Sequence, residues 1–224
     1  MSVHDNRGLR EPPATVEAAT RLVEKGFSLI PLHRPYARVL GSYLAKKNGK
    51  YPLTMMSFLG TSLGHKTPTS TFAKHPDANI GILTGRPYGV VIIDVDFPQG
   101  GESSMQALDL PGTLTAVTGN GLHLYYRHPG GRIPTCSGRL APGIDVKGEH
   151  SFATAPPSLH ASGHRYRWRE EDVAMSELPG TTVGRLRQLP QRGVLRDFVH
   201  ILALVRILLP ASALLARLLS GTER

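Results

Sequence analysis

Two aspartates, Asp94 and Asp96, stand at the end of an apolar run with one residue between them. Alternate side chains of an extended strand point to the same face, so the two carboxylates project together. Like charges this close are stabilised by a cation, and their hard oxygen atoms favour Mg²⁺ or Mn²⁺. The pair alone is also compatible with a strand that ends in a solvated turn, so other residues must decide.

A histidine lies in a glycine-rich segment, residues 118–127. Alternation along a strand places His123, Tyr125 and Arg127 on one face and apolar side chains on the other. Glycines let a ligand approach the backbone closely, and a histidine beside an arginine suits the binding of a triphosphate. Taken alone, a strand histidine is more often a structural hydrogen-bonding group.

A third carboxylate is found at Asp145, within residues 141–148. Here Ile144 and Val146 can face a core while Asp145 and Lys147 face the opposite side. Three carboxylates around two cations, with a phosphate-binding histidine, suit in-line nucleotidyl transfer, in which one metal activates the attacking hydroxyl and the other stabilises the departing pyrophosphate. The sequence therefore predicts a two-metal site.

These residues need a sheet to hold them, and the chain is rich in short apolar runs bounded by glycine or proline. Helical spacing begins at Thr15, a predicted N-cap, and stops at Gly26. We predict an α+β fold dominated by strands, in which the two central runs, residues 79–85 and 90–96, form a hairpin. The segment that follows Pro35, up to about residue 70, is expected to be irregular, with one helix. Further predicted strands are residues 27–32, 114–117, 122–127, 144–146 and 152–155, and a helix is predicted at residues 103–108.

The composition points to an acidic macromolecule as partner. The chain of 224 residues carries 26 Lys and Arg against 17 Asp and Glu, a formal charge of +9. Nucleic acid is the default partner of such a balance, although excess charge can also serve solubility alone. The single cysteine, Cys136, excludes an internal disulfide framework and suits the cytoplasm. The first residues carry charges and prolines where a secretory signal needs an apolar stretch.

Three regions follow from the changes in composition. Residues 1–13 are expected to be a flexible arm, residues 14–178 the catalytic domain, and residues 179–224 an Arg/Leu-rich helical tail of unknown role. The tail is apolar over residues 194–219, but Arg196, Arg206, Arg217 and Pro210 interrupt it. It falls short of the roughly 20 apolar residues that span a bilayer, so we expect no membrane contact. A truncated or frame-shifted gene would also explain its composition.

Three elements occur in a specific order: a strand ending in Asp94-x-Asp96, then Gly121-x-His123, then Gly143-Ile144-Asp145. They resemble the three motifs of the bifunctional DNA primase/polymerase N-terminal domain, in the archaeo-eukaryotic primase superfamily. The resemblance covers about residues 15–170. Further agreeing segments are Lys50-Tyr51-Pro52, residues 75–81, Thr84-Gly85, residues 155–158, Ser162-Gly163 and residues 166–168.

The resemblance implies a template-directed primase/polymerase acting on DNA and nucleoside triphosphates, with Asp94, Asp96 and Asp145 as ligands of Mg²⁺ or Mn²⁺ and His123 on the incoming nucleotide. It also implies an RRM-like, mainly antiparallel catalytic sheet packed with an N-terminal α/β unit. The chain departs from the family at Gly121, where a serine often precedes the motif histidine by two residues.

Residues close to the motifs are further candidates for contacts with nucleotide or template, although each also has an ordinary structural interpretation. They are Asn79, Arg139, Lys147 and His160, with Tyr166 and Trp168 as aromatic side chains that either stack on a base or belong to the core.

Three other functions compete with this interpretation. A glycosyltransferase also uses an Asp-x-Asp strand, but it explains neither His123 nor Asp145. A histidine-rich metallohydrolase would use His123, His150, His160 and His164, whose spacing matches no helical zinc motif. The third alternative is a truncated, non-catalytic accessory of replication. The sequence contains no Gly-x-x-x-x-Gly-Lys-Ser/Thr phosphate loop, so we expect a separate helicase or replication initiator as partner.

Overall fold

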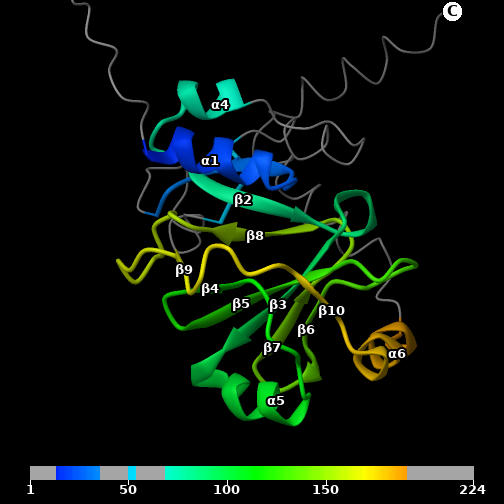
Figure 1. Cartoon of the computed structure of the whole chain (residues 1–224). Coiled ribbons are helices and arrows are strands. Elements are labelled where there is room, and N and C mark those ends of the chain that lie inside the picture. Colours follow the sequence, from blue (N-terminus) through cyan, green and yellow to red (C-terminus); the bar gives the residue numbers. More distant parts are fainter. Residues whose placement is uncertain (1–13, 36–49, 54–68, 191–224) are drawn as a thin grey trace, which may run out of the picture. The chain divides into compact units, whose positions relative to one another are not determined.

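The computed structural model describes residues 14–35, 50–53 and 69–190. In this part of the chain, two β-sheets lie between helices, and nearly all strand pairs are antiparallel (Figure 1). The predicted α+β class is confirmed. The expected arm, residues 1–13, and the tail from residue 191 onward lie outside the described residues, as does most of the segment expected to be irregular.

The smaller sheet has three antiparallel strands in the order β1-β2-β8. Its last strand comes from far along the chain, after the motif residues, so this α/β unit is not purely N-terminal. The first helix begins at Ala14, which places Thr15 inside the first turn rather than at the cap, and the chain leaves the helix through Gly26 at a φ of 90°. The elements are α1 (Ala14–Glu24), β1 (Leu29–Leu32), α4 (Thr69–Lys74), β2 (Asn79–Thr84) and β8 (Ser151–Ala155).

The larger sheet has the strand order β6-β7-β3-β5-β4-β9, and the short β10 runs parallel to the end of β5. It carries all three motifs. Two short 3-10 helices, η1 (Arg86–Tyr88) and η2 (Phe97–Gln99), stand before and after β3. The strands are β3 (Val90–Asp96), β4 (Thr115–Val117), β5 (Gly121–Arg127), β6 (Cys136–Ala141), β7 (Ile144–Lys147), β9 (Arg167–Trp168) and β10 (Ser176–Glu177).

The predicted hairpin between residues 79–85 and 90–96 is wrong. Strand β2 pairs with β1 and β8, whereas β3 pairs with β5 and β7, so the two runs belong to different sheets. A single bridge between Gly85 and Val90 joins them at the turn. Both runs are central strands that need a partner on each side, and a short turn between them gave no sign of this.

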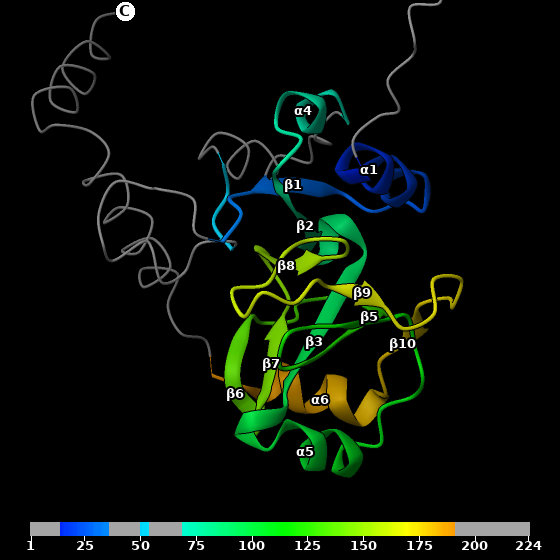
Figure 2. The ribbon, with the colours of Figure 1, turned by 90° about the vertical axis from the view of Figure 1, so that its left-hand side faces the viewer.

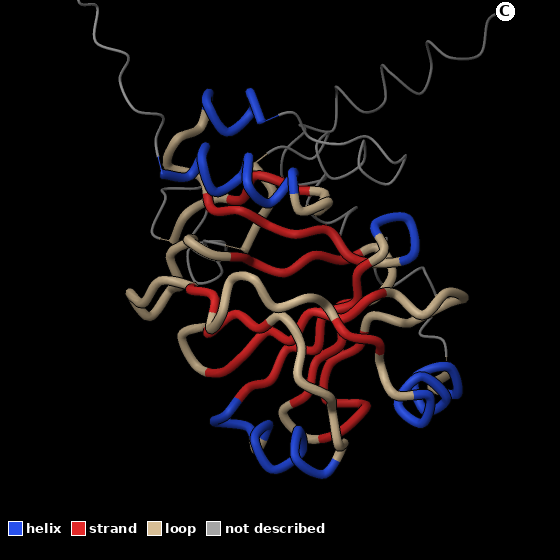
Figure 3. Tube along the Cα trace, viewed as in Figure 1, coloured by secondary structure: helices blue, strands red, loops and turns tan. Residues whose placement is uncertain are grey.

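Two cores lie on the two faces of the larger sheet, because β3 is apolar on both sides. Val90 and Ile92 belong to the core shared with the smaller sheet and α1. Val91, Ile93 and Val95 belong to a second core, which the helices α5 (Gly101–Ala107) and α6 (Gly180–Gln188) cover (Figure 2). Figure 3, coloured by secondary structure, shows the strands between α1 and α4 on one side and α5 and α6 on the other.

Helix α6 begins after the domain boundary that the composition suggested at residue 178. Its Val183 and Leu186 are buried in the second core, and its Arg185 donates a hydrogen bond to the carbonyl of Leu140 at 2.8 Å. The compact unit therefore extends to Leu189. None of the helices in the described ranges is long and apolar enough to cross a membrane.

The first residue of α5 fixes the ends of two motif strands. A Cβ atom on Gly101 would lie 2.6 Å from the carbonyl oxygen of Asp96 and 2.7 Å from that of Gly143. Both contacts are with backbone atoms, which cannot rotate away as a side chain would. The close approach of α5 to the ends of β3 and β7 therefore requires glycine at this position.

We predict that Gly101→Ala lowers the free energy of unfolding by about 1–3 kcal/mol, because the added methyl group overpacks a backbone contact. Gly184→Ala is the matched control, since no atom lies within 4 Å of its would-be Cβ inside α6. The control is expected to raise the free energy of unfolding by up to about 1 kcal/mol through helix propensity. Urea unfolding of both variants measures the difference, and equal effects would contradict the proposed close packing.

Candidate active site

The register of the larger sheet brings the motif residues together. Strand β3 lies between β5 and β7, and Asp94 stands opposite His123 on one neighbour and opposite Asp145 on the other. The three side chains therefore form a row across one face, as the alternation predicted. That face is shared with Ile92 and Tyr125 of the first core.

Asp94 is the centre of this row. Its Oδ1 lies 3.4 Å from Nε2 of His123, and its Oδ2 lies 3.4 Å from Nζ of Lys147. Burial of Asp94 is the largest influence and raises its pKa, but His123, Lys147 and the more distant Lys50 together lower the pKa well below the usual range. Asp94 is therefore an anion at neutral pH.

Asp145 is held by neighbours that leave one oxygen atom facing Lys147. Its Oδ1 accepts hydrogen bonds from the Ser137 hydroxyl at 2.6 Å and from the Gly138 amide at 3.1 Å. Its Oδ2 lies 3.4 Å from Nζ of Lys147, the same separation as that between Lys147 and Asp94. A tight ammonium–carboxylate bond measures about 2.7–2.9 Å. Lys147 therefore interacts with both carboxylates and forms a tight bond with neither.

Asp96 has an unused acceptor. Its Oδ2 accepts a hydrogen bond from the Gln99 side chain at 2.8 Å. Its Oδ1 is buried and has no hydrogen-bond partner among the described residues. A buried carboxylate oxygen without a partner is costly, because it has lost its water and gained nothing in return. The atom is free to bind a cation.

Among the described residues, no three His, Cys, Asp or Glu side chains are grouped closely enough to hold a metal ion as they stand. Carboxylate oxygens are the ligands that Mg²⁺ and Mn²⁺ prefer. Asp94 and Asp145 stand opposite each other on adjacent strands and share the ammonium group of Lys147, and Oδ1 of Asp96 has no hydrogen-bond partner among the described residues. These three carboxylates are the candidate ligands for a metal ion.

His123 is almost fully buried, with 5% of its surface exposed. Its ring lies against Tyr166 at 5.6 Å between ring centroids, and Tyr166 in turn contacts the ring of His160 at 5.7 Å. A Cβ on Gly119 would overlap the imidazole of His160, so this glycine lets His160 approach the turn before β5. The predicted residues His123 and His160 are thus connected through one tyrosine.

Gly121, where the sequence departs from the motif that it resembles, lies against the backbone of the neighbouring strand. A Cβ atom on this residue would overlap the carbonyl oxygen of Val95 on the adjacent strand β3. A serine cannot occupy this position without moving the strand that carries Asp94 and Asp96.

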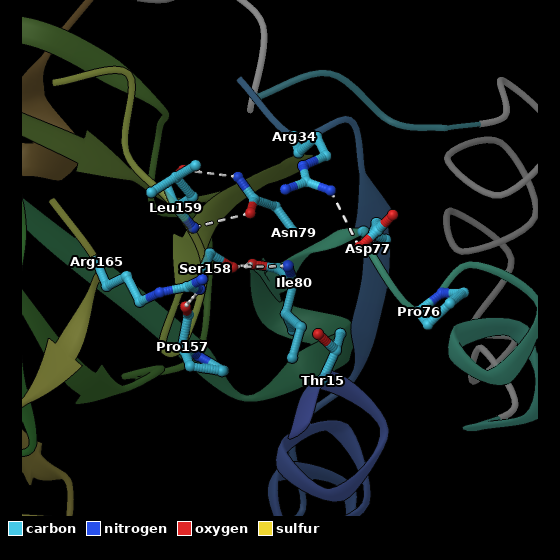
Figure 4. Close-up of a pocket in the computed structure, with 11 residues that line it drawn as sticks. Thr15, Arg34, Pro76, Asp77, Asn79, Ile80, Pro157, Ser158, Leu159 and Arg165 are labelled. Atoms are coloured by element: carbon cyan, nitrogen blue, oxygen red, sulfur yellow. Dashed lines mark hydrogen bonds and ion pairs between the residues drawn. The ribbon is translucent and has the colours of Figure 1, made fainter. Parts of the chain in front are cut away.

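Asn79 and Arg139, also predicted from the sequence, are placed away from the centre of the row. Asn79 is buried and exchanges two hydrogen bonds of 2.9 Å with the backbone of Leu159, next to His160 (Figure 4). It lines a small pocket together with Arg34 and Arg165. Arg139 lies half-buried on β6, where the register with β7 shifts between Ser137 and Ala141.

Two residues that position the carboxylates were not predicted. Ser137 holds Asp145 from β6, a strand interrupted by Gly138 and lacking the apolar alternation that identifies strands. Gln99 holds Asp96 from three residues further along, through the turn of η2. The spacing of Asp96 and Gln99 was a usable signal, because a 3-10 turn brings residues i and i+3 together.

We predict that Asp94→Asn lowers the free energy of unfolding of the metal-free protein at neutral pH by about 1.5–3 kcal/mol, because it removes charge-assisted contacts to His123 and Lys147. The pKa of Asp94 is depressed in the folded state, so its contribution is complete above the unfolded value of about 4 and is lost as pH falls further. Urea unfolding of both proteins between neutral and acidic pH is the measurement. A difference that stays constant below pH of about 4 would contradict the assignment.

Comparison with known protein families identifies the family of this chain. Residues 19–181 match the model of the family described as bifunctional DNA primase/polymerase, N-terminal. No curated protein matches the chain significantly. The matched segment contains all three motif strands and most of both sheets. Because the match spans well over half of the chain, the protein belongs to the bifunctional DNA primase/polymerase N-terminal domain family.

Proposed function

We propose that this chain is a template-directed DNA primase/polymerase, in which Asp94, Asp96 and Asp145 hold Mg²⁺ or Mn²⁺ and His123 contacts the incoming nucleotide. The observation that carries the proposal is the row of Asp94, His123 and Asp145 on three adjacent strands. The family implies DNA and nucleotides as substrates. Neither a glycosyltransferase nor a histidine-based hydrolase accounts for this row.

The charges of the row suit a triphosphate once a metal is bound. Bound Mg²⁺ or Mn²⁺ would polarise the attacking 3′ hydroxyl and neutralise the departing pyrophosphate. Lys147 would turn its ammonium group from the carboxylates to the phosphates, which its long 3.4 Å contacts allow. His123 is held beside Asp94 and would contact the incoming nucleotide from there.

The further candidates that lie close to the motifs in the sequence take supporting roles in this proposal. Asn79 holds the loop that carries His160 by its two bonds to Leu159. His160 and Tyr166 would border the nucleotide on the side of His123. Arg139 would contact nucleotide or template phosphates from β6. We further propose that the larger sheet is RRM-like, since helices cover one face and the chemistry lies on the other.

The partners follow from the same assignment. The formal charge of +9 suits the backbone of a DNA template. We propose a separate helicase or replication initiator as the partner that separates the DNA strands. Cytoplasmic replication of chromosomal, plasmid or phage DNA is the proposed setting.

We predict that Asp94→Asn and Asp145→Asn each reduce nucleotide incorporation at least about 1000-fold, because each removes a metal ligand. The assay supplies primed and unprimed single-stranded templates, all nucleotides, and Mg²⁺ or Mn²⁺, and a chelator is expected to abolish the product. Product from the unprimed template would identify primer synthesis.

Asp172→Asn is the matched control for these substitutions. This carboxylate is exposed and pairs with Lys25 at 3.5 Å, away from the motif strands in sequence. It is expected to retain wild-type activity. A wild-type protein that binds DNA and stays inert with both metals would favour the alternative, a non-catalytic replication accessory.

We predict that Lys147→Met raises the KM for nucleoside triphosphate about 10-fold and changes kcat by less than about 3-fold, because the ammonium group binds phosphate equally in ground and transition states. Steady-state incorporation on a primed template is the measurement. Lys25→Met is the control, since the Lys25 ammonium group donates to the carbonyl of Glu171 at 2.7 Å and pairs with Asp172 at 3.5 Å on the surface. A kcat effect without a change in KM would contradict this role of Lys147.

A further inference from the structure

Strand β5 carries a buried hydroxyl that the proposed chemistry does not use. Tyr125 is fully buried between the two sheets, and its hydroxyl has no hydrogen-bond partner in the described part of the chain. The ring packs against Phe27 at 6.2 Å and Trp168 at 5.1 Å between centroids. Burial, followed by the proximity of Tyr166 and Asp94, raises the pKa of Tyr125, so the hydroxyl keeps its proton and remains a donor.

The next residue shows how a buried tyrosine of this strand is normally satisfied. Tyr126 points to the opposite core, and its hydroxyl donates a hydrogen bond of 2.9 Å to the carbonyl of Pro111. The two tyrosines are adjacent, and both are buried. Only Tyr125 lacks a partner, and it is the one on the face of the candidate active site.

A second unsatisfied atom lies on the same face, two residues earlier. Nδ1 of His123 is buried and also has no partner among the described residues. The rings of His123 and Tyr125 meet edge to face, with centroids 6.5 Å apart. The chemistry of the two atoms is complementary, because a hydroxyl donates and a neutral imidazole accepts on one nitrogen. Burying both without a partner is unfavourable, so pairing them relieves two penalties at once.

We propose that Tyr125 is a positioning residue for His123. One buried water accepts a hydrogen bond from the Tyr125 hydroxyl and donates one to Nδ1 of His123. When Nδ1 accepts, the ring proton resides on Nε2, which is the nitrogen 3.4 Å from Oδ1 of Asp94. The result is a chain from Tyr125 through His123 to Asp94. It fixes both the tautomer and the orientation of the histidine, as a second hydrogen-bonding partner does for histidines in other sites.

Tyr166 and Asp94 lie near the Tyr125 hydroxyl, and each of them has another partner. The Tyr166 hydroxyl is hydrogen-bonded to the side chain of Thr154. The two oxygens of Asp94 face His123 and Lys147. A buried water is compatible with the site, because such waters occur where several polar groups surround them and bind otherwise unsatisfied atoms. The effect on nucleotide binding rests on the proposed function of His123, whereas the hydrogen bond itself does not.

The hydrogen bond is tested by nitrogen-15 NMR of the histidine rings at alkaline pH, where the imidazoles are neutral. His123→Gln identifies the His123 signals by their loss. We expect the wild type to show the proton on Nε2 and an Nδ1 that accepts a hydrogen bond. Tyr125→Phe should move the Nδ1 resonance, and Tyr126→Phe should leave it in place. An unchanged Nδ1 resonance in Tyr125→Phe would overturn the proposal.

The same variants separate positioning from stability. Tyr125→Phe loses the proposed hydrogen bond and leaves Nδ1 of His123 unpaired, and Tyr126→Phe loses the bond to Pro111, so both variants are expected to lower the Tm. The Kd for a non-hydrolysable nucleoside triphosphate with Mg²⁺ should rise about 5-fold in Tyr125→Phe and stay constant in Tyr126→Phe. Equal Kd values in the two variants, or no nucleotide binding by the wild type, would overturn the positioning role.

These readouts do not depend on turnover. A wild type that fails to extend primers contradicts the proposed function, while the nitrogen-15 signals still decide whether Tyr125 bonds to His123. Conversely, if the enzyme is active and its Nδ1 resonance is the same in the wild type and in Tyr125→Phe, the proposed function stands and this inference is wrong.

Discussion

The cross-strand register around β3 is the constraint on which the site depends. A slip of one residue on either side would carry Asp94 to the opposite face from His123 or Asp145, because side chains alternate along a strand. The register is fixed by packing rather than by the polar residues themselves. Val90 and Ile92 fill one core, and Val91, Ile93 and Val95 fill the other, so either face of the strand resists a slip. The apolar residues thereby determine where the charges meet.

Burial disfavours the negative charges of the row, and nearby positive charges favour them. Bringing Asp94, Asp96 and Asp145 to one end of a sheet is unfavourable without positive charge. Lys147 provides part of it, at the same 3.4 Å from Asp94 and Asp145. Asp96 retains an unsatisfied oxygen atom. An arrangement that leaves an acceptor unused and an ammonium loosely held is suited to accept further cations, which a fully paired network would exclude.

Residues of neighbouring elements hold the side chains of this face in position. Ser137 orients Asp145, Gln99 orients Asp96, and the close contact of Gly101 places α5 against the ends of β3 and β7. On the other side, the rings of Tyr166 and His160 continue from His123 toward the loop that Asn79 holds. The two sheets therefore contribute different parts of one site: the larger sheet holds the charges, and the smaller sheet, through Asn79 at the start of β2, fixes its border.

The sequence by itself determined the strands around Asp94, His123 and Asp145, the face that each side chain takes, and the family, because alternation and motif order are local properties. It did not determine that β2 and β3 part into different sheets, since strand pairing depends on partners distant in the chain, such as β8. Nor did it predict Ser137, Gln99 or the unsatisfied pair of His123 and Tyr125, whose roles arise only when separate segments pack together. Local pattern sets which way a side chain points, whereas tertiary packing alone decides what it meets there.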